Sequence, residues 1–436
     1  MSSYKFELNN YHAVKEAKIK IDGITVLAGL NGSGKSTVSR WLHHVVYTLN
    51  QYDSMVEKSG INDIIRFFNK MERVLFSVVS YSKARDLRTI INKITEDEIS
   101  SVTQTAPYYE DASNLLLTLL YEHLCKENGL DDFGRIERFF QIEREDNDDV
   151  TVFLDKLRQK LDSDYQSIID NVCRLKETHT SENFADRIFS IADSEIEDDG
   201  INIGLTEDGV ELVTEEQFKV PLMLRNAIYI DTHKIGQALG ADPYRSGDLA
   251  RMLDTPRSEV SDNARVIARM IQNIVGGNVQ VVRDYGKLMS GGKFQFVSKN
   301  GRSFNLKGAA TGIISFSYIL QLLQHGWINE DTLLIIDEPE SHLHPQWVVE
   351  YARVLVMIHK LIGTKIVISS HNPDMVSAIE SISRKEELED MTRFYLSEQA
   401  KGMDGLYSFR DLGFDIAEIF DSFNIALDRI TFYGCS

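Results

Sequence analysis

The sequence predicts an α/β fold whose central sheet contains parallel strands. Three stretches carry this prediction: Gly29–Ser36 fits the pattern G-x-x-x-x-G-K-[ST], the aliphatic run Leu333–Ile336 ends in Asp337-Glu338, and Ile366–Ser370 ends in His371. In each case polar groups follow a predicted strand, and the carboxyl ends of parallel strands meet at one edge of a sheet. This layout is typical of a P-loop nucleoside triphosphatase.

The first stretch predicts a phosphate-binding loop. Ile24–Ala28 indicates a buried strand, the loop glycines let backbone N–H groups point inward, and Ser36–Leu49 indicates a helix whose amino end faces the same point. Lys35 would reach the outer phosphates, and the Ser36 hydroxyl would bind Mg²⁺. A chance glycine-rich turn is the alternative, but the strand and helix are both where the motif requires them. The predicted nucleotide contacts are Gly29, Asn31, Gly32, Ser33, Gly34, Lys35, Ser36 and Thr37.

The other two stretches predict the rest of the site. Four aliphatic residues before Asp337 indicate a strand covered on both faces, so Asp337 would emerge at its end to hold Mg²⁺. Glu338, one residue later, could orient or deprotonate the attacking water. His371 at the end of a third strand could contact the γ-phosphate. The alternatives are a solvated acidic pair and a structural histidine.

The motifs resemble a known family. Asp337–Pro345, followed by Ser370–Pro373, resembles the ABC-type ATPases related to RecF, the SMC proteins and the OLD group, especially the AAA-15/AAA-21 branch of bacterial antiphage systems. Leu8–Ala17 is similar to the opening strand segment of that branch, with His12 in place of its usual arginine. The resemblance implies an ABC-type ATPase head with a mixed central sheet, which binds ATP and Mg²⁺ between two protomers.

The resemblance also assigns roles to residues. It makes Lys35 and Ser36 the Walker A contacts, Asp337 and Glu338 the Walker B pair, and His371 the switch histidine. Ser341 and His342 would belong to the D-loop, which borders the partner's nucleotide. No Q-loop glutamine is assigned.

A signature motif has two candidates. Leu288–Lys293 is close to LSGGQ, but it leads into Phe294–Val297, which alternates like a strand, so we expect a loop before a hairpin. Ala309–Gly312 instead opens the helical run Ile313–Gln324, which ends before Gly326. The predicted signature contacts are therefore Ala310, Thr311 and Gly312. Ala310 replaces the usual serine, so one hydroxyl contact is missing and slow hydrolysis is expected.

The middle of the chain differs from both ends in composition and periodicity. Residues 51–200 are charged and helical in period, as in Ala112–Leu120, without sustained heptads. We expect a helical insertion, either a docking surface or a structural lobe, and no long coiled-coil arm. The acidic segments 143–149 and 194–200 are predicted loops. The predicted domain ranges are 1–50 and 201–436 for the ATPase and 51–200 for the insertion.

Other elements complete the ATPase sheet and its helices. The residues after His371 are used in this way, so a TOPRIM nuclease like that of OLD proteins is not expected. The predicted elements are strands within Ile201–Val213 and at Asn226–Asp231, a helix at Asp262–Ile274, a helix at Asp374–Ile382, strands at Arg393–Ser397 and Gly405–Phe409, and a helix at Ile416–Ala426.

Composition limits the alternatives. Cys125, Cys173 and Cys435 form no zinc or disulfide pattern, which favours a reducing compartment. No signal peptide or membrane span is evident, so a cytoplasmic protein without a membrane partner is expected. The net charge of −19 disfavours nucleic acid binding over the whole surface, although a local site stays open. The candidate basic groups are Arg66, Lys70, Arg73, Lys83, Arg85 and Arg88, for which a solvated helix face is the favoured interpretation.

These observations predict an ATP-binding and ATP-hydrolysing subunit that dimerises around ATP. By its resemblance to the Septu (PtuA) or PARIS ATPases, it would control a separate effector, a nuclease, in antiphage defence. The alternatives are a RecF- or SMC-like DNA repair ATPase and an ATP-gated scaffold with little turnover. A transporter subunit is disfavoured by the large insertion and by the absence of LSGGQ.

Overall fold

The computed structural model describes residues 2–79, 81–97, 99–126, 132–142, 149–192, 202–232, 248–257, 259–282, 293–341 and 343–421. Within it the chain forms two compact units, unit 1 (residues 1–50 and 184–436) and unit 2 (residues 51–183). The first break coincides with the start of the predicted insertion, and the second falls before its predicted end at residue 200. The three predicted domain ranges stay a prediction.

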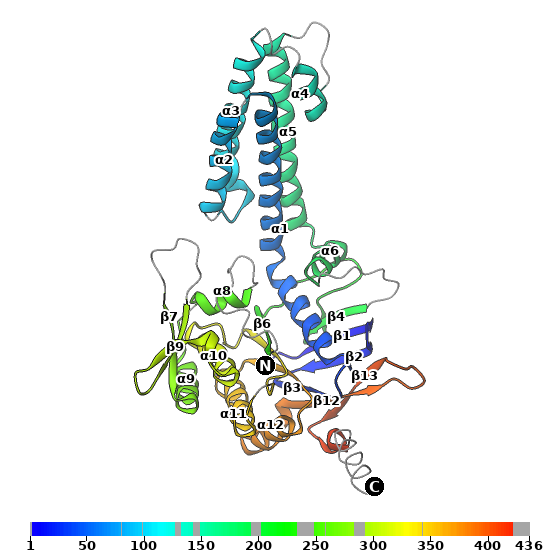
Figure 1. Ribbon diagram of the computed structural model, residues 1–436. Coiled ribbons are helices and arrows are strands. Elements are labelled where there is room, and N and C mark those ends of the chain that lie inside the picture. Colours follow the sequence, from blue (N-terminus) through cyan, green and yellow to red (C-terminus); the bar gives the residue numbers. More distant parts are fainter. Residues whose placement is uncertain are drawn as a thin grey trace, which may run out of the picture. The chain divides into compact units, whose positions relative to one another are not determined.

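A mixed sheet organises unit 1 (Figure 1). Among the described residues its strand order is β5-β4-β1-β2-β13-β12-β3-β11-β10-β6. The strands are β1 (Tyr4–Tyr11), β2 (Val14–Ile21), β3 (Ile24–Ala28), β4 (Asn202–Glu207), β5 (Val210–Glu211), β6 (Asn226–Asp231), β10 (Thr332–Asp337), β11 (Lys365–Ser370), β12 (Thr392–Gln399) and β13 (Tyr407–Gly413). The neighbours from β12 to β6 pair in parallel, whereas β4, β1 and β2 pair antiparallel. The predicted α/β class and mixed sheet are confirmed.

The parallel strands are covered on both faces. Every residue of β3, β10 and β11 is buried, as continuous aliphatic runs require. Alternate residues such as Val26, Ile336 and Ile368 pack in one core with α10, α11 and α12. On the opposite face, the ring of His43 in α1 lies 5.7 Å from that of Tyr229 in β6. The helices of unit 1 are α6 (Ser181–Ala192), α8 (Asp248–Asp254), α9 (Asp262–Val275), α10 (Thr311–Gln324), α11 (Pro345–Ile362), α12 (Pro373–Lys385) and the start of α1 (Lys35–Val78).

A small antiparallel sheet lies in the chain between α9 and α10. It contains β7 (Gly277–Val282), β8 (Lys293–Ser298) and β9 (Ser303–Asn305). The predicted hairpin after residue 293 is therefore confirmed. Ser290, Gly291 and Gly292, the centre of the rejected signature candidate, lie outside the described residues.

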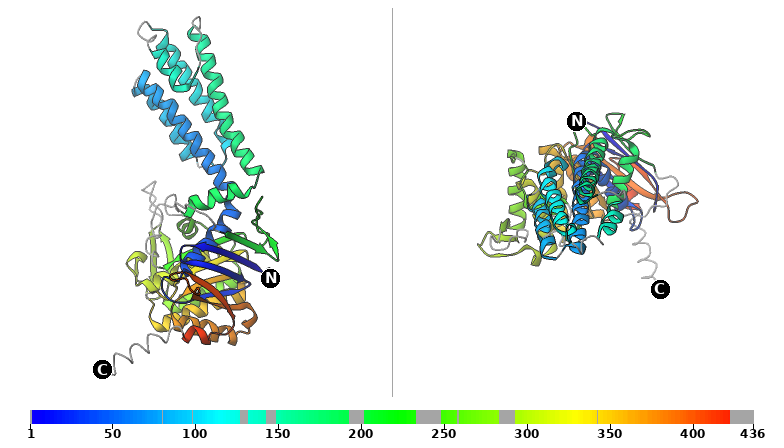
Figure 2. Two further views of the ribbon diagram at one scale, coloured as in Figure 1. Left: turned by 90° about the vertical axis from the view of Figure 1, so that its right-hand side faces the viewer. Right: turned by 90° about the horizontal axis from the view of Figure 1, so that it is seen from above.

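Unit 2 is a helical bundle. It contains the later turns of α1 together with α2 (Tyr81–Glu96), α3 (Ala106–Leu124), α4 (Phe133–Phe140) and α5 (Val150–Glu177). Lys176 Nζ lies 2.7 Å from Glu57 Oε1, and Gly60 lies against Val172, so α1 and α5 run antiparallel and side by side (Figures 1 and 2). Tyr109 of α3 stacks on Tyr165 of α5 with ring centroids 4.0 Å apart. This third helix and the aromatic core make a bundle and not a two-stranded coiled coil.

Some local predictions differ from the structure. The predicted helix Ser36–Leu49 is only the beginning of α1, which has 44 residues and contains no proline to end it near residue 50. The acidic segment 194–200 and residues 143–148 lie outside the described residues, as does Cys435. Cys125 and Cys173 are exposed and free. No helix in the described ranges is long and apolar enough to cross a membrane.

Candidate nucleotide site

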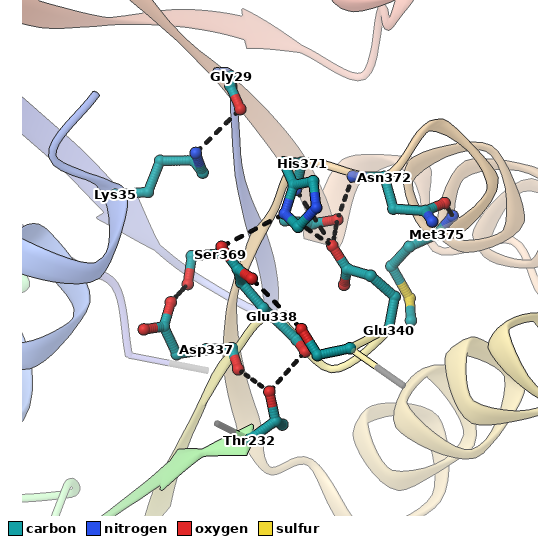
Figure 3. A network of polar contacts seen from close by, with 12 residues as sticks. Gly29, Lys35, Thr232, Asp337, Glu338, Glu340, Ser369, His371, Asn372 and Met375 are labelled. Atoms are coloured by element: carbon teal, nitrogen blue, oxygen red, sulfur yellow. Dashed lines mark hydrogen bonds and ion pairs between the residues drawn. The ribbon is translucent and has the colours of Figure 1, made fainter. Parts of the chain in front are cut away.

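The carboxyl ends of four parallel strands bring the predicted polar groups together. In the strand register Ala28 lies beside Ser370, and Asp337 lies between Ser369 on one side and Asp231 on the other. The phosphate loop follows Ala28, and His371 follows Ser370. Three motifs from distant parts of the sequence thus meet at one edge of the sheet (Figure 3).

Close packing requires glycine in the phosphate loop. Gly29 has φ +145°, and a Cβ there would lie 2.1 Å from Ser397 Oγ of β12. Gly34 has φ +86°, and its Cβ would lie 2.7 Å from a methyl group of Val14. Ser397 also donates a hydrogen bond of 2.6 Å to the buried Ser33 hydroxyl. The neighbouring strand therefore holds the loop in a shape that no other residue type tolerates at Gly29.

Lys35 is the buried cation of the site. Its Nζ donates to the carbonyl oxygens of Gly29 at 2.9 Å and Leu30 at 2.7 Å (Figure 3). Burial lowers the pKa of Lys35, while the carboxylates of Glu338, Asp337 and Glu340 act in the opposite direction. The ammonium group thus lies within the loop that would surround the phosphates. Asn31 and Gly32 are exposed on that loop, and Thr37 is half-buried in the first turn of α1.

Asp337 is held by hydroxyl groups from three elements. Its Oδ1 accepts from Ser36 at 3.0 Å and from Ser369, and its Oδ2 accepts from Tyr229 at 3.1 Å. Burial, followed by the charge of Asp337, raises the pKa of Tyr229, so the phenol keeps its proton and stays a donor. Ser36 and Asp337 offer oxygen ligands side by side, which fits Mg²⁺ completed by water and phosphate oxygens. In the described ranges no group of three or more His, Cys, Asp or Glu side chains that could hold a metal is found.

Glu338 has an unusual backbone. Its φ is +50°, in the left-handed region that non-glycine residues occupy at a cost of about 1–3 kcal/mol. Its N–H donates to Ser369 O at 2.9 Å, and Thr232 Oγ1 lies 2.7 Å from its carbonyl oxygen and 2.8 Å from that of Asp337. These contacts fix the turn and direct the Glu338 side chain to the sheet edge.

His371 lies between two carboxylates. Its Nδ1 is 3.3 Å from Glu338 Oε1 and 3.7 Å from Glu340 Oε1, and both acids point toward the imidazole in Figure 3. Glu340 is only 5% exposed, and burial raises its pKa, against the effect of Ser370 and His371. The histidine, 38% exposed at its side chain, is the part of this group that a ligand could reach.

The signature candidate belongs to another element. Ala310 is the exposed N-cap residue of α10, and Thr311 is its exposed first residue. Gly312 is buried instead, and a Cβ there would lie 2.6 Å from the Trp347 ring of α11. Its lack of a side chain therefore serves packing, and only Ala310 and Thr311 present side chains outward. None of the three is among the contacts of Lys35, Asp337, Glu338 and His371 given above.

The structure adds contacts that sequence reasoning missed. Ser341, predicted to border the partner's nucleotide, donates to Glu338 Oε2 at 3.3 Å, and His342 lies outside the described residues. Tyr229 and Thr232, at the end of β6, donate hydrogen bonds to the Asp337 side chain and to the Asp337 carbonyl oxygen, respectively. Neither residue was predicted, and no Q-loop glutamine was assigned from the sequence. Thr232, Ser369 and Ser370 could have been predicted as site residues, because each lies at the carboxyl end of a predicted strand. No local pattern marks Glu340 or Ser397.

A family model matches most of the chain. The family AAA_21, described as "AAA domain, putative AbiEii toxin, Type IV TA system", matches residues 24–377. The matched range begins at β3 and ends within α12, so it contains Lys35, Asp337, Glu338 and His371. No curated protein matches the chain.

SMC heads are among the solved structures to which the chain is similar. A crystal structure of the SmcHead bound to the C-winged helix domain of ScpA is 10% identical, with a TM-score of 0.41, and the alignment covers 95% of this chain and 98% of that one. The SMC head domain from Thermotoga maritima is 9% identical, with a TM-score of 0.37 and coverages of 94% and 99%. The Smc head domain with an extended coiled coil from Pyrococcus furiosus is 11% identical, with a TM-score of 0.35 and coverages of 99% and 100%.

Proposed function

This chain belongs to the AAA_21 family of AAA domains, and we propose that it binds ATP with Mg²⁺ and hydrolyses it. The observation that carries the proposal is the convergence of Lys35, the Ser36–Asp337 pair, Glu338 and His371 at one sheet edge. Each has the chemistry that phosphoryl transfer to water requires.

Binding rests on positive and partly positive groups. Lys35 and the N–H groups of the phosphate loop surround the phosphates, and the amino end of α1 adds its dipole. Mg²⁺ would be held by Ser36 and Asp337 and would neutralise developing charge on the phosphate oxygens. Tyr229 and Ser369 keep the Asp337 carboxylate turned toward Ser36.

Hydrolysis rests on Glu338 and His371. Glu338 Oε1 and Oε2 lie at the edge of the site, where the carboxylate can accept a proton from the attacking water. His371 can donate a hydrogen bond to the γ-phosphate as negative charge moves in the transition state. Because Ala310 lacks the usual signature hydroxyl, turnover is expected to be slow.

The ATP site is completed by a second protomer in this proposal. Ala310 and Thr311 are exposed at the start of α10 and available to a neighbouring molecule. The ATP-bound dimer would control a separate effector, a nuclease, in antiphage defence within the cytoplasm. Two observations support this role: the motif resemblance at Asp337–Pro345 and the family description, which names a putative toxin of a type IV toxin–antitoxin system.

A DNA repair ATPase is the second candidate, and it would need free basic groups. Lys70 lines a cavity of about 500 Å³ in unit 2 beside Phe139, a pairing that suits nucleic acid. However, Arg66 lies 3.1 Å from Asp63 and Arg88 lies 3.6 Å from Glu72. Ion pairs thus occupy two of the candidate basic groups whose side chains the structure describes, and the motif resemblance and family description given above make effector control the first candidate.

The substitution Glu338→Gln tests hydrolysis separately from binding. The amide cannot take a proton from water, so ATP affinity should persist while turnover falls by at least about a hundredfold. The ATP-bound protein should then accumulate as a dimer in light scattering after size-exclusion chromatography. Glu389→Gln, at an exposed position in the turn after α12, controls for the loss of one charge and should behave as wild type. Undiminished phosphate release by Glu338→Gln would remove Glu338 from the mechanism.

A further inference from the structure

Glu340 is a buried carboxylate that no step above uses. Its Oε1 accepts from Ser370 Oγ at 2.7 Å and from the backbone N–H of His371 at 3.1 Å. The acid thus joins the turn after β10 to the end of β11. Burying a carboxyl group at 5% exposure is unfavourable unless its oxygens are hydrogen-bonded or paired with a charge.

One polar atom of Glu340 and one of His371 lack hydrogen bonds. Glu340 Oε2 and His371 Nδ1 are both buried, and neither has a hydrogen-bond partner in the part of the chain that the structure describes. Buried polar atoms without partners are rare and call for an explanation. A bond from Nδ1–H of His371 to Glu340 Oε2 would satisfy both, and it needs a small rotation of the side chains, because the approach of 3.7 Å is between Nδ1 and Oε1.

Glu338 competes for the same imidazole nitrogen. It lies nearer to Nδ1, at 3.3 Å against 3.7 Å for Glu340, although neither contact is a hydrogen bond. On the proposed function, Glu338 must turn to water when ATP is bound. The imidazole then needs another carboxylate to keep its proton on Nδ1 and its Nε2 toward the phosphate.

We propose that Glu340 is the positioning residue for His371: it takes the Nδ1–H of the imidazole, so that Nε2 faces the γ-phosphate and Glu338 is left for water. The role toward the γ-phosphate rests on the proposed function. The pairing of Glu340 with His371 does not depend on that function. Figure 3 shows the arrangement from which it follows, with Glu340 and Glu338 both directed at one ring. The rival reading is that Glu340 only ties two strand ends together through Ser370 and the His371 peptide.

Two variants separate these readings. Glu340→Gln keeps the size of the side chain and one acceptor oxygen for the strand link, but removes the charge beside the imidazole. Ser370→Ala removes one bond of the strand link and keeps the charge. The thermal midpoint of each variant verifies that it is folded, and Glu389→Gln again serves as the charge control.

The decisive measurement is the protonation of the ring nitrogens in nucleotide-free protein. Spectra of ¹⁵N-histidine protein give the tautomer, and His371→Ala assigns the signal. In Glu338→Gln, where the competing charge is gone, the proton should stay on Nδ1. In the double variant Glu338→Gln/Glu340→Gln it should move to Nε2, whereas Glu338→Gln/Ser370→Ala should keep it on Nδ1. Loss of the Nδ1 proton in Glu338→Gln alone would overturn the proposal.

The rate of ATP hydrolysis provides the second test. Glu340→Gln should lower kcat by about 10- to 100-fold, the range for groups that orient a functional histidine, with KM for ATP little changed. In a His371→Ala background it should have no further effect, because Glu340 acts through that ring. If Glu340→Gln lowered kcat equally with and without His371→Ala, or if Ser370→Ala lowered kcat as much as Glu340→Gln does, Glu340 would only tie the two strand ends together. A wild-type protein that binds ATP without turnover would contradict the proposed function, and the nitrogen spectra would still decide the role of Glu340.

Discussion

Asp337 shows how single residues set the chemistry of this site. Hydroxyl groups of Ser36, Ser369 and Tyr229 reach its two oxygens, so the carboxylate has one orientation. Arg40, one turn after Ser36, adds a cation beside this group. Burial opposes its charge, but Tyr229, Asp231 and Asp337 outweigh that effect and raise the pKa of Arg40. In the proposed role of Asp337 as a Mg²⁺ ligand, a carboxylate fixed in this way would lose little entropy when the metal binds.

The substitution Tyr229→Phe tests this orientation. It removes only the phenol that donates to Asp337 Oδ2, so ATP-site packing should persist. The Mg²⁺ concentration for half-maximal turnover should rise by about 10- to 100-fold, as for other partners of metal ligands. Tyr407→Phe, a half-buried tyrosine in β13, is the matched control. An unchanged Mg²⁺ dependence would mean that Ser36 and Ser369 suffice to orient Asp337.

A second residue-scale prediction concerns Lys35→Ala. The variant loses charge-assisted hydrogen bonds to phosphate of about 1.5–3 kcal/mol, so ATP affinity should fall by about 10- to 100-fold. Titration with a fluorescent ATP analogue and Mg²⁺ measures this, and circular dichroism checks the fold. Lys18→Ala removes an exposed lysine paired with Glu16 and should bind as wild type. Equal affinity of the two variants would place the nucleotide elsewhere.

Among the secondary-structure elements, the start of α10 combines a buried position, Gly312, with an exposed one, Ala310. An acidic substitution at Gly312 would be ambiguous, because any side chain there meets Trp347. Ala310 is exposed at the N-cap, and its backbone already has the extended conformation of a capping residue. Aspartate is a favourable N-cap residue, worth about 1 kcal/mol over alanine. Ala310→Asp therefore preserves the helix and adds a charge at its amino end.

The prediction is that Ala310→Asp abolishes turnover, because its carboxylate repels the γ-phosphate of ATP bound to the other protomer. Ala310→Asn caps the helix equally without the charge and should remain active. Mixing Ala310→Asp with Lys35→Ala should restore part of the activity, since about half of freely exchanging dimers are hybrids with one intact site. Full activity of Ala310→Asp alone would show that the signature is elsewhere, and the other candidate, at Gly291-Gly292, would become the next to test.

At the scale of the whole molecule, two histidines make stability depend on pH. Burial, followed by the charge of His44, lowers the pKa of His43 to about 3, and burial, followed by Arg40, lowers that of His44 to about 4. Both values are below the ordinary 6.5, so below that pH the unfolded chain binds protons that the folded chain does not. The contribution of these two histidines to the free energy of unfolding is therefore fully present above pH 6.5 and is lost progressively as the pH falls toward 4.

Urea unfolding at a series of pH values, followed by tryptophan fluorescence, measures this loss. Trp41, Trp327 and Trp347 all belong to unit 1, which contains both histidines, so the signal reports on the right unit. His43→Gln should make the pH dependence shallower between 6.5 and 4. His12→Asn, at an exposed turn with positive φ, should not. Parallel pH profiles for wild type and His43→Gln would contradict the assignment.

Strands and loops with a local signature could be predicted from the sequence. The aliphatic runs before Asp337 and His371 predicted strands buried on both faces, the glycines before Lys35 predicted a tight loop, and the structure has all three. Because parallel strand ends meet at one edge, these local signals also predicted that Lys35, Asp337, Glu338 and His371 lie together. The structure brings them together, and their roles stay predictions.

Only the tertiary structure decided which partners orient those residues. Tyr229 is 108 positions from Asp337 and Ser397 is 364 positions from Ser33, and each pair meets only through sheet order and register. The same holds for Gly312 against Trp347 and for Glu340 between Ser370 and His371. A side chain that supports another across a sheet has no spacing rule of its own along the chain. Its position depends on the packing of whole strands and helices, which a local pattern does not encode.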